Sequence, residues 1–360
     1  MKTNKMKTPT PTTSHIAPGS LAQLSELARQ LTAQGKPREA AAAIEQIFAG
    51  DVPKDEGSAR LLAEARQSYI ACQEELVRQD RLAGAQVAAE LQAETEKIAD
   101  YPIRVAFEGD AGVPDGRGVR LAWEQGCGQH LVVCRHEPEH LQTYHLAVAL
   151  MRIQTETEAC RARKSRVPTV SMRQKRKLLS LFHPRAAKIL SGEEPHITIN
   201  PSPEDVALDP FRLLLASAPY MLVDARLRQR YPLLRPAQFL SLTRTSLDDW
   251  EARGEMIRMT PLRDRTITAL DGLQGLFLDW LSAGVTDFAE RYRLLDGFDL
   301  SQKLWQHWQT RFPEMRPGDE FDILDHFAAI LGLPGTFTWV PGPSKPSGAL
   351  SASPDNAPSF

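Results

Sequence analysis

The sequence lacks a hydrophobic run long enough to cross a membrane. Its most apolar windows, residues 211–223 and 273–285, contain a charged residue or a proline and are shorter than the roughly 20 residues that a spanning helix needs. The basic start of the chain is followed by Pro, Thr and Ser rather than by the apolar core of a signal peptide. We therefore predict a disordered leader over residues 1–19, no membrane partner and a cytoplasmic location.

Cysteine and net charge are also scarce. The four cysteines, Cys72, Cys127, Cys134 and Cys160, form no CxxC pair and no spacing typical of disulfide-stapled domains, so reduced thiols are expected. The formal net charge of -2 gives no global attraction to nucleic acid, and any polyanion binding must come from a local patch.

The familiar catalytic motifs are missing as well. The sequence contains no GxSxG nucleophile elbow, no P-loop and no GxGxxG after a strand. The sequence therefore favours a non-enzymatic protein without excluding an enzyme, and no motif indicates a cofactor.

What the sequence does contain begins with a helical hairpin. Apolar residues recur at helical spacing through residues 20–49, and the 360-residue chain is long enough for about two domains. Gly35 is suited to end the first helix, and Pro37 is suited to open the second at its first helical position. Helical character continues through residues 58–98, so we predict a helical arm over residues 20–99.

The hairpin resembles a tetratricopeptide-type repeat. The resemblance rests on a small residue in the first helix, a glycine at the turn, a Glu-Ala pair early in the second helix and a closing corner: Ala28, Gly35, Glu39-Ala40 and Asp51-Val52-Pro53. The aromatic residue that the family carries early in the first helix is absent, and Leu24 stands near its place. The resemblance implies a surface that docks a protein partner or braces the rest of the chain.

The remainder is predicted to be a mixed body over residues 100–340. Three strand-like runs at 103–107, 119–123 and 131–134, separated by Gly, Asp and Pro clusters, predict a short antiparallel meander. A long central helix is predicted from 138 to about 163. Further helices are expected at 203–230, 236–254, 260–282, 284–296, 299–311 and 318–331, and a disordered tail at 341–360. The fold class is α+β, predominantly helical.

One string matches the letters of the HExxH zinc-peptidase motif. It reads His136-Glu137-Pro138-Glu139-His140. The motif requires both histidines on one face of a continuous helix, with the glutamate acting as general base. Because proline costs about 3 kcal/mol inside a helix but is tolerated in its first turn, Pro138 most naturally begins the helix. His136 then lies in the preceding loop, and the paired geometry is lost.

Residues 100–240 also resemble the scaffold of zincin-type metallopeptidases. In that comparison residues 144–153 are similar to the family run x-x-L-A-H-E-x-x-H-x, and Val148, Ala149 and Arg152 occupy the three functional places. The resemblance implies a pseudoenzyme that has lost its metal ligands and its general base.

Other candidate metal ligands lie close to this string. Six lie between residues 127 and 145, namely Cys127, His130, Cys134, His136, His140 and His145. Their spacing matches no common zinc finger, and core cysteines with surface histidines are the more ordinary interpretation. Asp224 is a candidate third ligand downstream, although a pairing with Arg228 four residues later explains it better.

The segment 159–192 is basic and contains no acidic residue. Its candidate anion-binding residues are Arg173, Lys175, Arg176 and Lys177, with Arg161, Arg163, Lys164, Arg166, Arg185 and Lys188 around them. Such cations neutralise phosphate, although a charge run is more often a solvated surface.

Three functions follow from these observations. The leading prediction is a non-catalytic protein-interaction or regulatory module, in the form of a pseudoenzyme if the zincin resemblance holds. The first alternative is a metal-dependent hydrolase that uses zinc on His136 and His140, with Glu137 as base and His145 or Asp224 as a further ligand. The second alternative is polyanion or nucleic-acid binding through residues 161–188.

Overall fold

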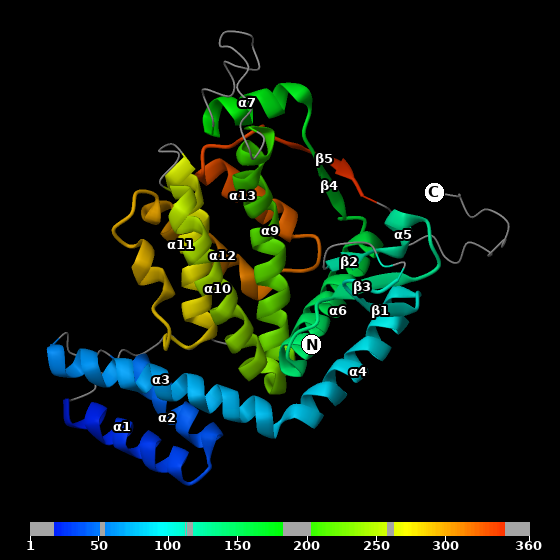
Figure 1. The fold of residues 1–360 in the computed structure, drawn as a ribbon. Helices are drawn as coiled ribbons and strands as arrows, with labels where there is room; N and C mark the ends of the chain where they lie inside the picture. Colours follow the sequence, from blue (N-terminus) through cyan, green and yellow to red (C-terminus); the bar gives the residue numbers. More distant parts are fainter. Residues whose placement is uncertain are drawn as a thin grey trace, which may run out of the picture. The chain divides into compact units, whose positions relative to one another are not determined.

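A computed structural model describes residues 18–50, 55–111, 113, 118–182, 203–257 and 263–342 (Figure 1). The described chain is mostly helical with two small sheets, which confirms the predicted fold class. The leader before residue 18, the corner at 51–53, Arg185, Lys188 and the tail after residue 342 lie outside the described residues. The chain divides into two compact units, of which unit 1 is the part up to Arg78 with Ser282–Thr286, and unit 2 is the remainder.

Unit 1 opens with α1 (Pro18–Ala33) and α2 (Pro37–Ala49). As predicted, Gly35 closes α1: its φ is +69°, and the bonds Lys36 N–H to Leu31 O and Gly35 N–H to Thr32 O form a Schellman motif. Pro37 occupies the start of α2, where its missing N–H costs nothing. Gly35 and Pro37 therefore determine where the turn between α1 and α2 lies.

The third helix of unit 1, α3 (Glu56–Gln79), completes its core. The Tyr69 hydroxyl donates to the Glu45 carboxylate at 2.8 Å, and the Arg66 Nε donates to the Val285 carbonyl at 2.9 Å. The buried side chains of this core include Ala28, Ala40, Ile44, Ile47, Tyr69, Cys72 and Leu76.

Unit 2 begins with α4 (Arg81–Ala99), which packs against the central helix α6 (Glu139–Arg161). The division at Arg78 therefore falls earlier than the expected end of the arm at residue 99. The reason is that the apolar face of α4, with Ala88 and Leu91, is buried within unit 2.

The sheet that follows differs from the predicted meander. It contains β1 (Ile103–Phe107), β2 (Gly118–Arg120) and β3 (His130–Cys134) in the order β1-β3-β2. β3 pairs in parallel with β1 and antiparallel with β2, so the predicted pairing of the first two strands is wrong. The short helix α5 (Ala122–Gln125) returns the chain so that β3, the strand with most buried residues, takes the central position.

Most predicted helices of unit 2 are confirmed within a few residues. They are α6, α9 (Pro203–Arg230), α10 (Arg235–Ile257), α11 (Arg263–Leu281), α12 (Phe298–Arg311) and α13 (Glu320–Ile330), and the basic segment contains a further helix, α7 (Met172–Phe182). The helix predicted at 284–296 is wrong, because that region holds only a 3-10 helix at Phe288–Tyr292. The Asp279 carboxylate accepts the N–H groups of Phe288 and Ala289 at its start. In the part of the chain that the structure describes, no helix has the length and apolar character to span a bilayer.

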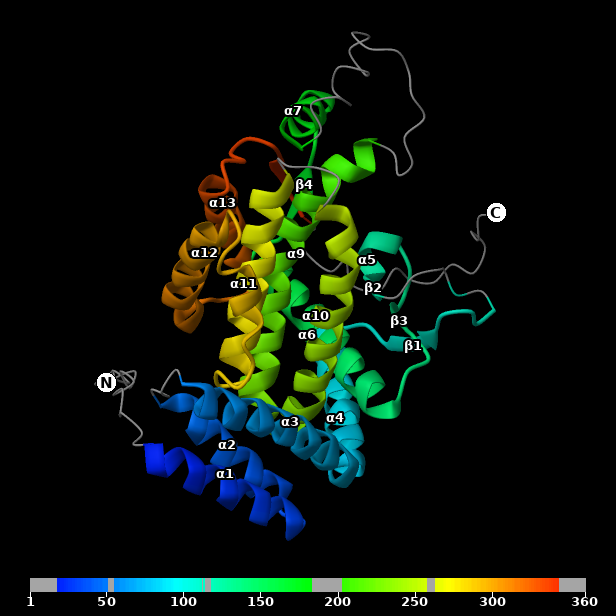
Figure 2. The same cartoon turned by 60° about the vertical axis from the view of Figure 1, so that its left-hand side comes forward.

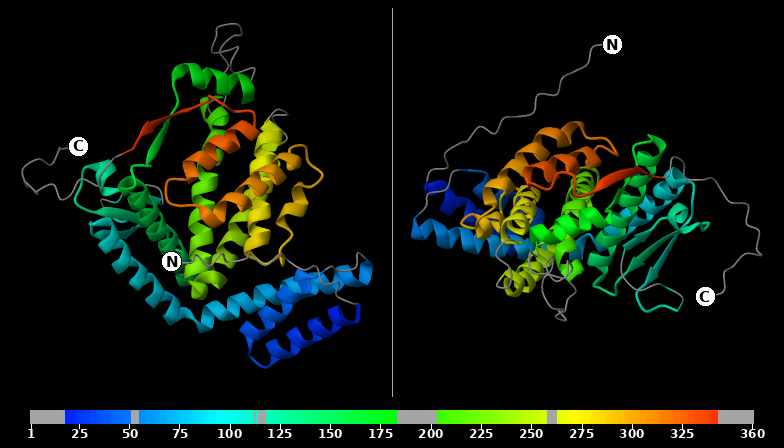
Figure 3. Two further views of the ribbon diagram at one scale, coloured as in Figure 1. Left: turned by 180° about the vertical axis from the view of Figure 1, so that it is seen from behind. Right: turned by 90° about the horizontal axis from the view of Figure 1, so that it is seen from above.

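A second sheet joins two distant segments that sequence analysis did not recognise as strands. β4 (Arg166–Thr169) pairs antiparallel with β5 (Thr338–Pro341), with Val167 opposite Val340. The pair lies side by side in Figure 1 and, seen from behind, in Figure 3, where β5 is red. It brings the basic segment next to the end of the described chain.

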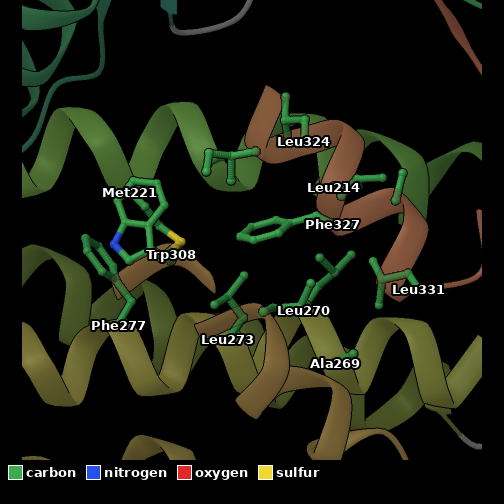
Figure 4. Packing of buried hydrophobic residues seen from close by; sticks show 14 of the residues in the cluster. Leu214, Met221, Ala269, Leu270, Leu273, Phe277, Trp308, Leu324, Phe327 and Leu331 are labelled. Atoms are coloured by element: carbon green, nitrogen blue, oxygen red, sulfur yellow. The ribbon is translucent and has the colours of Figure 1, made fainter. Parts of the chain in front are cut away.

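The main core of unit 2 is formed by α7, α9, α11, α12 and α13 (Figure 4). Phe327 and Leu214 have 0% exposure, and Trp308 has 1%. Phe277 meets Trp308 edge-on, with ring centroids 6.4 Å apart, a geometry that adds to the burial of both rings. Trp280, Trp305 and Trp308 belong to this core, whereas the side chain of Trp250 lies outside the described residues.

Leu304, which is fully buried in α12, provides a test of this core. We expect Leu304→Ala to lower the free energy of unfolding by about 2–5 kcal/mol, because it removes buried methyl groups and leaves a cavity. The matched control is Leu294→Ala, whose side chain is 96% exposed and should cost less than about 0.5 kcal/mol. Chemical denaturation followed by tryptophan fluorescence measures both. Equal decreases in the free energy of unfolding of the two variants would contradict the placement of Leu304 in the core.

Candidate functional site

The HExxH-like string adopts the geometry that its proline predicts. Pro138 is the N-cap of α6, and its carbonyl accepts the N–H groups of Leu141 and Gln142. His136 therefore lies in the loop before the helix, whereas His140 is in the first turn and its side chain lies outside the described residues. The motif requires both histidines on one continuous helix, but here only His140 lies on the helix.

The other candidate ligands between residues 127 and 145 have separate surroundings. His136 stacks on Phe107 with ring centroids 4.7 Å apart, and the exposed Cys127 donates its thiol to the Gln129 carbonyl. Cys134 is buried, and burial raises the pKa of its thiol. Among the side chains that the structure describes, no three His, Cys, Asp or Glu residues converge in a way that could hold a metal ion.

His130 is fully buried at the start of β3. Its Nδ1 accepts the Ala122 N–H at 3.0 Å, so the proton of the neutral ring is on Nε2. The ring meets Tyr101 and Trp123 edge-on, with centroids 5.3 and 4.9 Å away, and Nε2 has no hydrogen-bond partner. Burial lowers the pKa of His130 to about 4, because the charged ring would lose its hydration.

The three zincin-like positions lie in the middle of α6. Ala149 is buried, Val148 is half-buried and Arg152 is exposed. None of these side chains can supply the imidazole or carboxylate that the family uses.

Two polar networks instead connect α6 with α9 and α10, which are labelled together in Figure 2. In the first network the Tyr144 hydroxyl donates to Asp224 Oδ1. The Gln238 side-chain amide donates to the same oxygen at 3.1 Å and to the Asp224 backbone carbonyl at 2.9 Å. The partners of Asp224 are therefore Tyr144 and Gln238, rather than the expected Arg228.

Asp224 is one of the most strongly perturbed acids among the described residues. Its side chain is buried, and burial raises the pKa of the carboxyl group to about 6 despite the two hydrogen bonds that favour the charged form. The carboxyl group therefore titrates close to neutral pH within the three-helix contact.

The second network contains His145, a predicted alternative metal ligand, and Glu137, the predicted alternative base. His145 Nδ1 lies 2.7 Å from Glu137 Oε2, and His145 Nε2 lies 2.9 Å from the Ser241 hydroxyl. The order serine, imidazole, carboxylate is that of the hydrogen-bond relay in serine hydrolases. A hydrolase also needs an accessible nucleophile and N–H donors for an oxyanion. Ser241 is 4% exposed and sits within α10, whose N–H groups are used by the helix, so we interpret the relay as structural.

Sequence analysis missed Glu320. Its side chain is 2% exposed and accepts the Gly318 N–H at 2.7 Å. Burial raises the pKa of Glu320 to about 7. It also missed Arg226, a half-buried residue of α9. The sequence signal for this region was the group of polar residues Gln154, Thr155 and Glu158 in the second half of α6.

The first half of the basic segment is neutralised within the chain. Arg161 pairs with Asp100 at 2.7 Å, and Lys164 pairs with Asp319 at 2.6 Å. Arg166 pairs with Asp322 at 2.9 Å and lies 4.0 Å from Asp325. Arg163 is exposed and has no carboxylate partner among the described residues, so the cations of this segment that remain for an anion there are Arg163 and those of α7.

Helix α7 carries the four predicted anion-binding residues. Arg173, Arg176 and Lys177 are exposed, Lys175 is half-buried, and Arg173 and Arg176 have no carboxylate partner among the described residues. Lys177 donates to the Pro334 carbonyl at 2.9 Å. Arg173 and Lys177 line a cleft of about 670 Å³ that also contains Ser171, Gln174, Gly335 and Thr338.

Asp224 makes the stability of unit 2 depend on pH. The unfolded carboxyl group titrates near 3.8 and the folded one near 6, so stability is lost as pH rises through this window. Asp224→Asn keeps an oxygen acceptor but cannot ionise. We expect the variant to gain about 2 kcal/mol relative to wild type between pH 4 and pH 7. Chemical denaturation at both pH values measures the free energy of unfolding of the two proteins. A difference between them that does not change with pH would contradict a buried carboxyl group with a raised pKa.

His130 gives the opposite response. Its pKa is 6.5 in the unfolded chain and about 4 in the folded one, so stability is present above pH 6.5 and lost as pH falls toward 4. His130→Asn retains an acceptor for the Ala122 N–H and removes the titration. Relative to wild type, the variant should gain about 3 kcal/mol between pH 7 and pH 4. A parallel pH dependence of the two proteins would argue against a buried neutral ring.

Comparison of the chain with known protein families, curated proteins and solved structures finds no match.

Proposed function

We propose that this chain is a non-catalytic protein-interaction module, whose α1–α2 hairpin docks an amphipathic helix of a partner protein. The observation that carries the proposal is an apolar stripe on α1 that α2 leaves partly uncovered. Leu21 and Ala28 are buried against the hairpin, whereas Leu24 and Leu31 are half-buried and Leu27 is 44% exposed.

The spacing of the uncovered residues identifies the occupant. Leu24, Leu27 and Leu31 are separated by three and four positions and so follow one line along a helix. A straight apolar line of this kind fits the apolar face of a second helix, which anchors itself at the same i, i+3, i+7 spacing. The hairpin's resemblance to a tetratricopeptide-type repeat also implies a surface that docks a protein partner.

The non-catalytic part of the proposal draws on the body. Each described residue of the alternative hydrolase site already has another contact: His136 stacks on Phe107, Glu137 pairs with His145, and Asp224 accepts from Tyr144. Together with Val148, Ala149 and Arg152 at the zincin-like positions, these contacts support a pseudoenzyme frame. A zinc hydrolase built on His136, Glu137 and His140 would have to break the Glu137–His145 pair.

Leu27→Glu tests the docking surface. Because Leu27 is exposed, the variant should keep the wild-type unfolding midpoint and lose at least tenfold in affinity for the partner helix. The measurement is co-purification with tagged full chain, identification of the partner, and calorimetric titration of the two purified proteins. The matched control is Ala22→Glu, which adds the same charge on another exposed face of α1 and should bind normally.

Two outcomes would contradict this proposal. One is a partner that binds Leu27→Glu as tightly as wild type, or a full chain that stays a free monomer in every host and salt condition. The other is stoichiometric zinc in protein purified without a histidine tag, which would favour the hydrolase.

A further inference from the structure

A cleft of about 340 Å³ opens between α6 and α9 in unit 2. Its volume falls in the range of small-ligand sites. Its floor is formed by buried residues of α6, and charged side chains from both helices stand over it. The lining residues are Met151, Gln154, Thr155, Glu158, Arg226, Gln229 and Arg230.

Arg226 is the unusual member of this lining. Its side chain is half-buried, and loss of hydration lowers the pKa of the guanidinium group. Nη1 donates to the Thr155 hydroxyl at 3.3 Å, and no carboxylate lies within 4 Å of the guanidinium among the described residues. A guanidinium group has five N–H donors, and removing it from water is costly unless an anion or several acceptors receive them.

The carboxylates near Arg226 act only from a longer distance, and two of them are engaged elsewhere. Asp319 pairs with Lys164, and Glu320 accepts the Gly318 N–H. Glu158 lines the cleft itself and has no ion-pair partner among the described residues. Of the remaining cations, Arg230 is paired with Glu94 at 2.5 Å. The cleft thus presents the Arg226 guanidinium and the Glu158 carboxylate, neither of which has an ion-pair partner among the described residues.

We propose that this cleft binds a small α-amino acid, with the ligand carboxylate on Arg226 and its ammonium group on Glu158. A planar guanidinium accepts a carboxylate through two parallel hydrogen bonds, which suits Arg226. The exposed amide of Gln229 offers a further polar contact, and Met151 supplies an apolar surface for the ligand side chain. This site is independent of the proposed docking surface on α1.

Titration of the full chain with each of the twenty common L-amino acids tests the proposal. At least one should give saturable binding by calorimetry or ligand-observed NMR. The N-acetyl derivative and the amide of that amino acid each remove one charge, and each should bind at least tenfold more weakly. Binding of the N-acetyl derivative at full strength would overturn the proposal in favour of a peptide C-terminus as the ligand. Failure of all twenty amino acids, or equal binding of the amide, would likewise overturn the proposal.

Substitutions separate this role from a structural one. Arg226→Met should weaken binding at least tenfold while leaving the unfolding midpoint of unit 2 unchanged or higher, because it removes an unpaired buried charge. Glu158→Gln, on the exposed rim, should weaken binding of the amino acid but not of its N-acetyl derivative. Arg104→Met, an exposed strand residue, is the matched control and should change neither property.

Results with these variants can also contradict the proposed amino-acid site. If Arg226→Met binds the amino acid as tightly as wild type, the proposed site is wrong. The site is also wrong if wild type binds no amino acid and Arg226→Met has a lower unfolding midpoint. If Arg226→Met does not fold, Arg226→Lys serves in its place, since it keeps the charge but loses the planar fork and should bind more weakly. Leu27→Glu should bind the amino acid normally, so failure of the docking proposal and failure of this one can be told apart.

Discussion

The organisation of unit 2 depends on the polar groups that α6 carries into the interior. A buried hydroxyl, amide or carboxyl group without a partner costs about 1–3 kcal/mol, so each one must meet a complementary group from another element. Tyr144 meets Asp224 of α9, His145 meets Ser241 of α10, and Gln154 donates to Thr95 of α4. Apolar packing alone tolerates sliding between helices, whereas these bonds define which residues face each other. They therefore fix the position of α6 among its three neighbours.

Local features of this fold were readable from the sequence. Gly35, Pro37 and Pro138 act through backbone conformation within a few residues, so they locate the ends of α1, α2 and α6 without any knowledge of tertiary structure. For the same reason the displacement of His136 from the helix could be foreseen. Helical periodicity likewise located α9 to α13, because each of these helices buries one face.

The remaining features depend on contacts between distant residues. The parallel pairing of β1 with β3 and the pairing of β4 with β5 follow from tertiary packing that short strands do not encode. Asp224 was assigned to Arg228 by local spacing, yet its partners lie 80 and 14 residues away in the chain. The pairing of Lys164 with Asp319 and of Arg166 with Asp322 is equally non-local, and it removes two of the cations on which the polyanion hypothesis drew. The cleft residue Arg226 carried no sequence signal of its own.

The opposite titrations of Asp224 and His130 have a consequence for calorimetry. At pH 5 folded unit 2 holds a protonated carboxyl group and a neutral imidazole, and unfolding reverses both states because the ordinary pKa values are 3.8 and 6.5. One proton leaves Asp224 and one is taken up by His130 in the same cooperative event. The two groups together then exchange almost no net proton with the solvent. Their contribution to the measured enthalpy at this pH is therefore independent of the ionisation heat of the buffer, although each group alone would make it buffer-dependent.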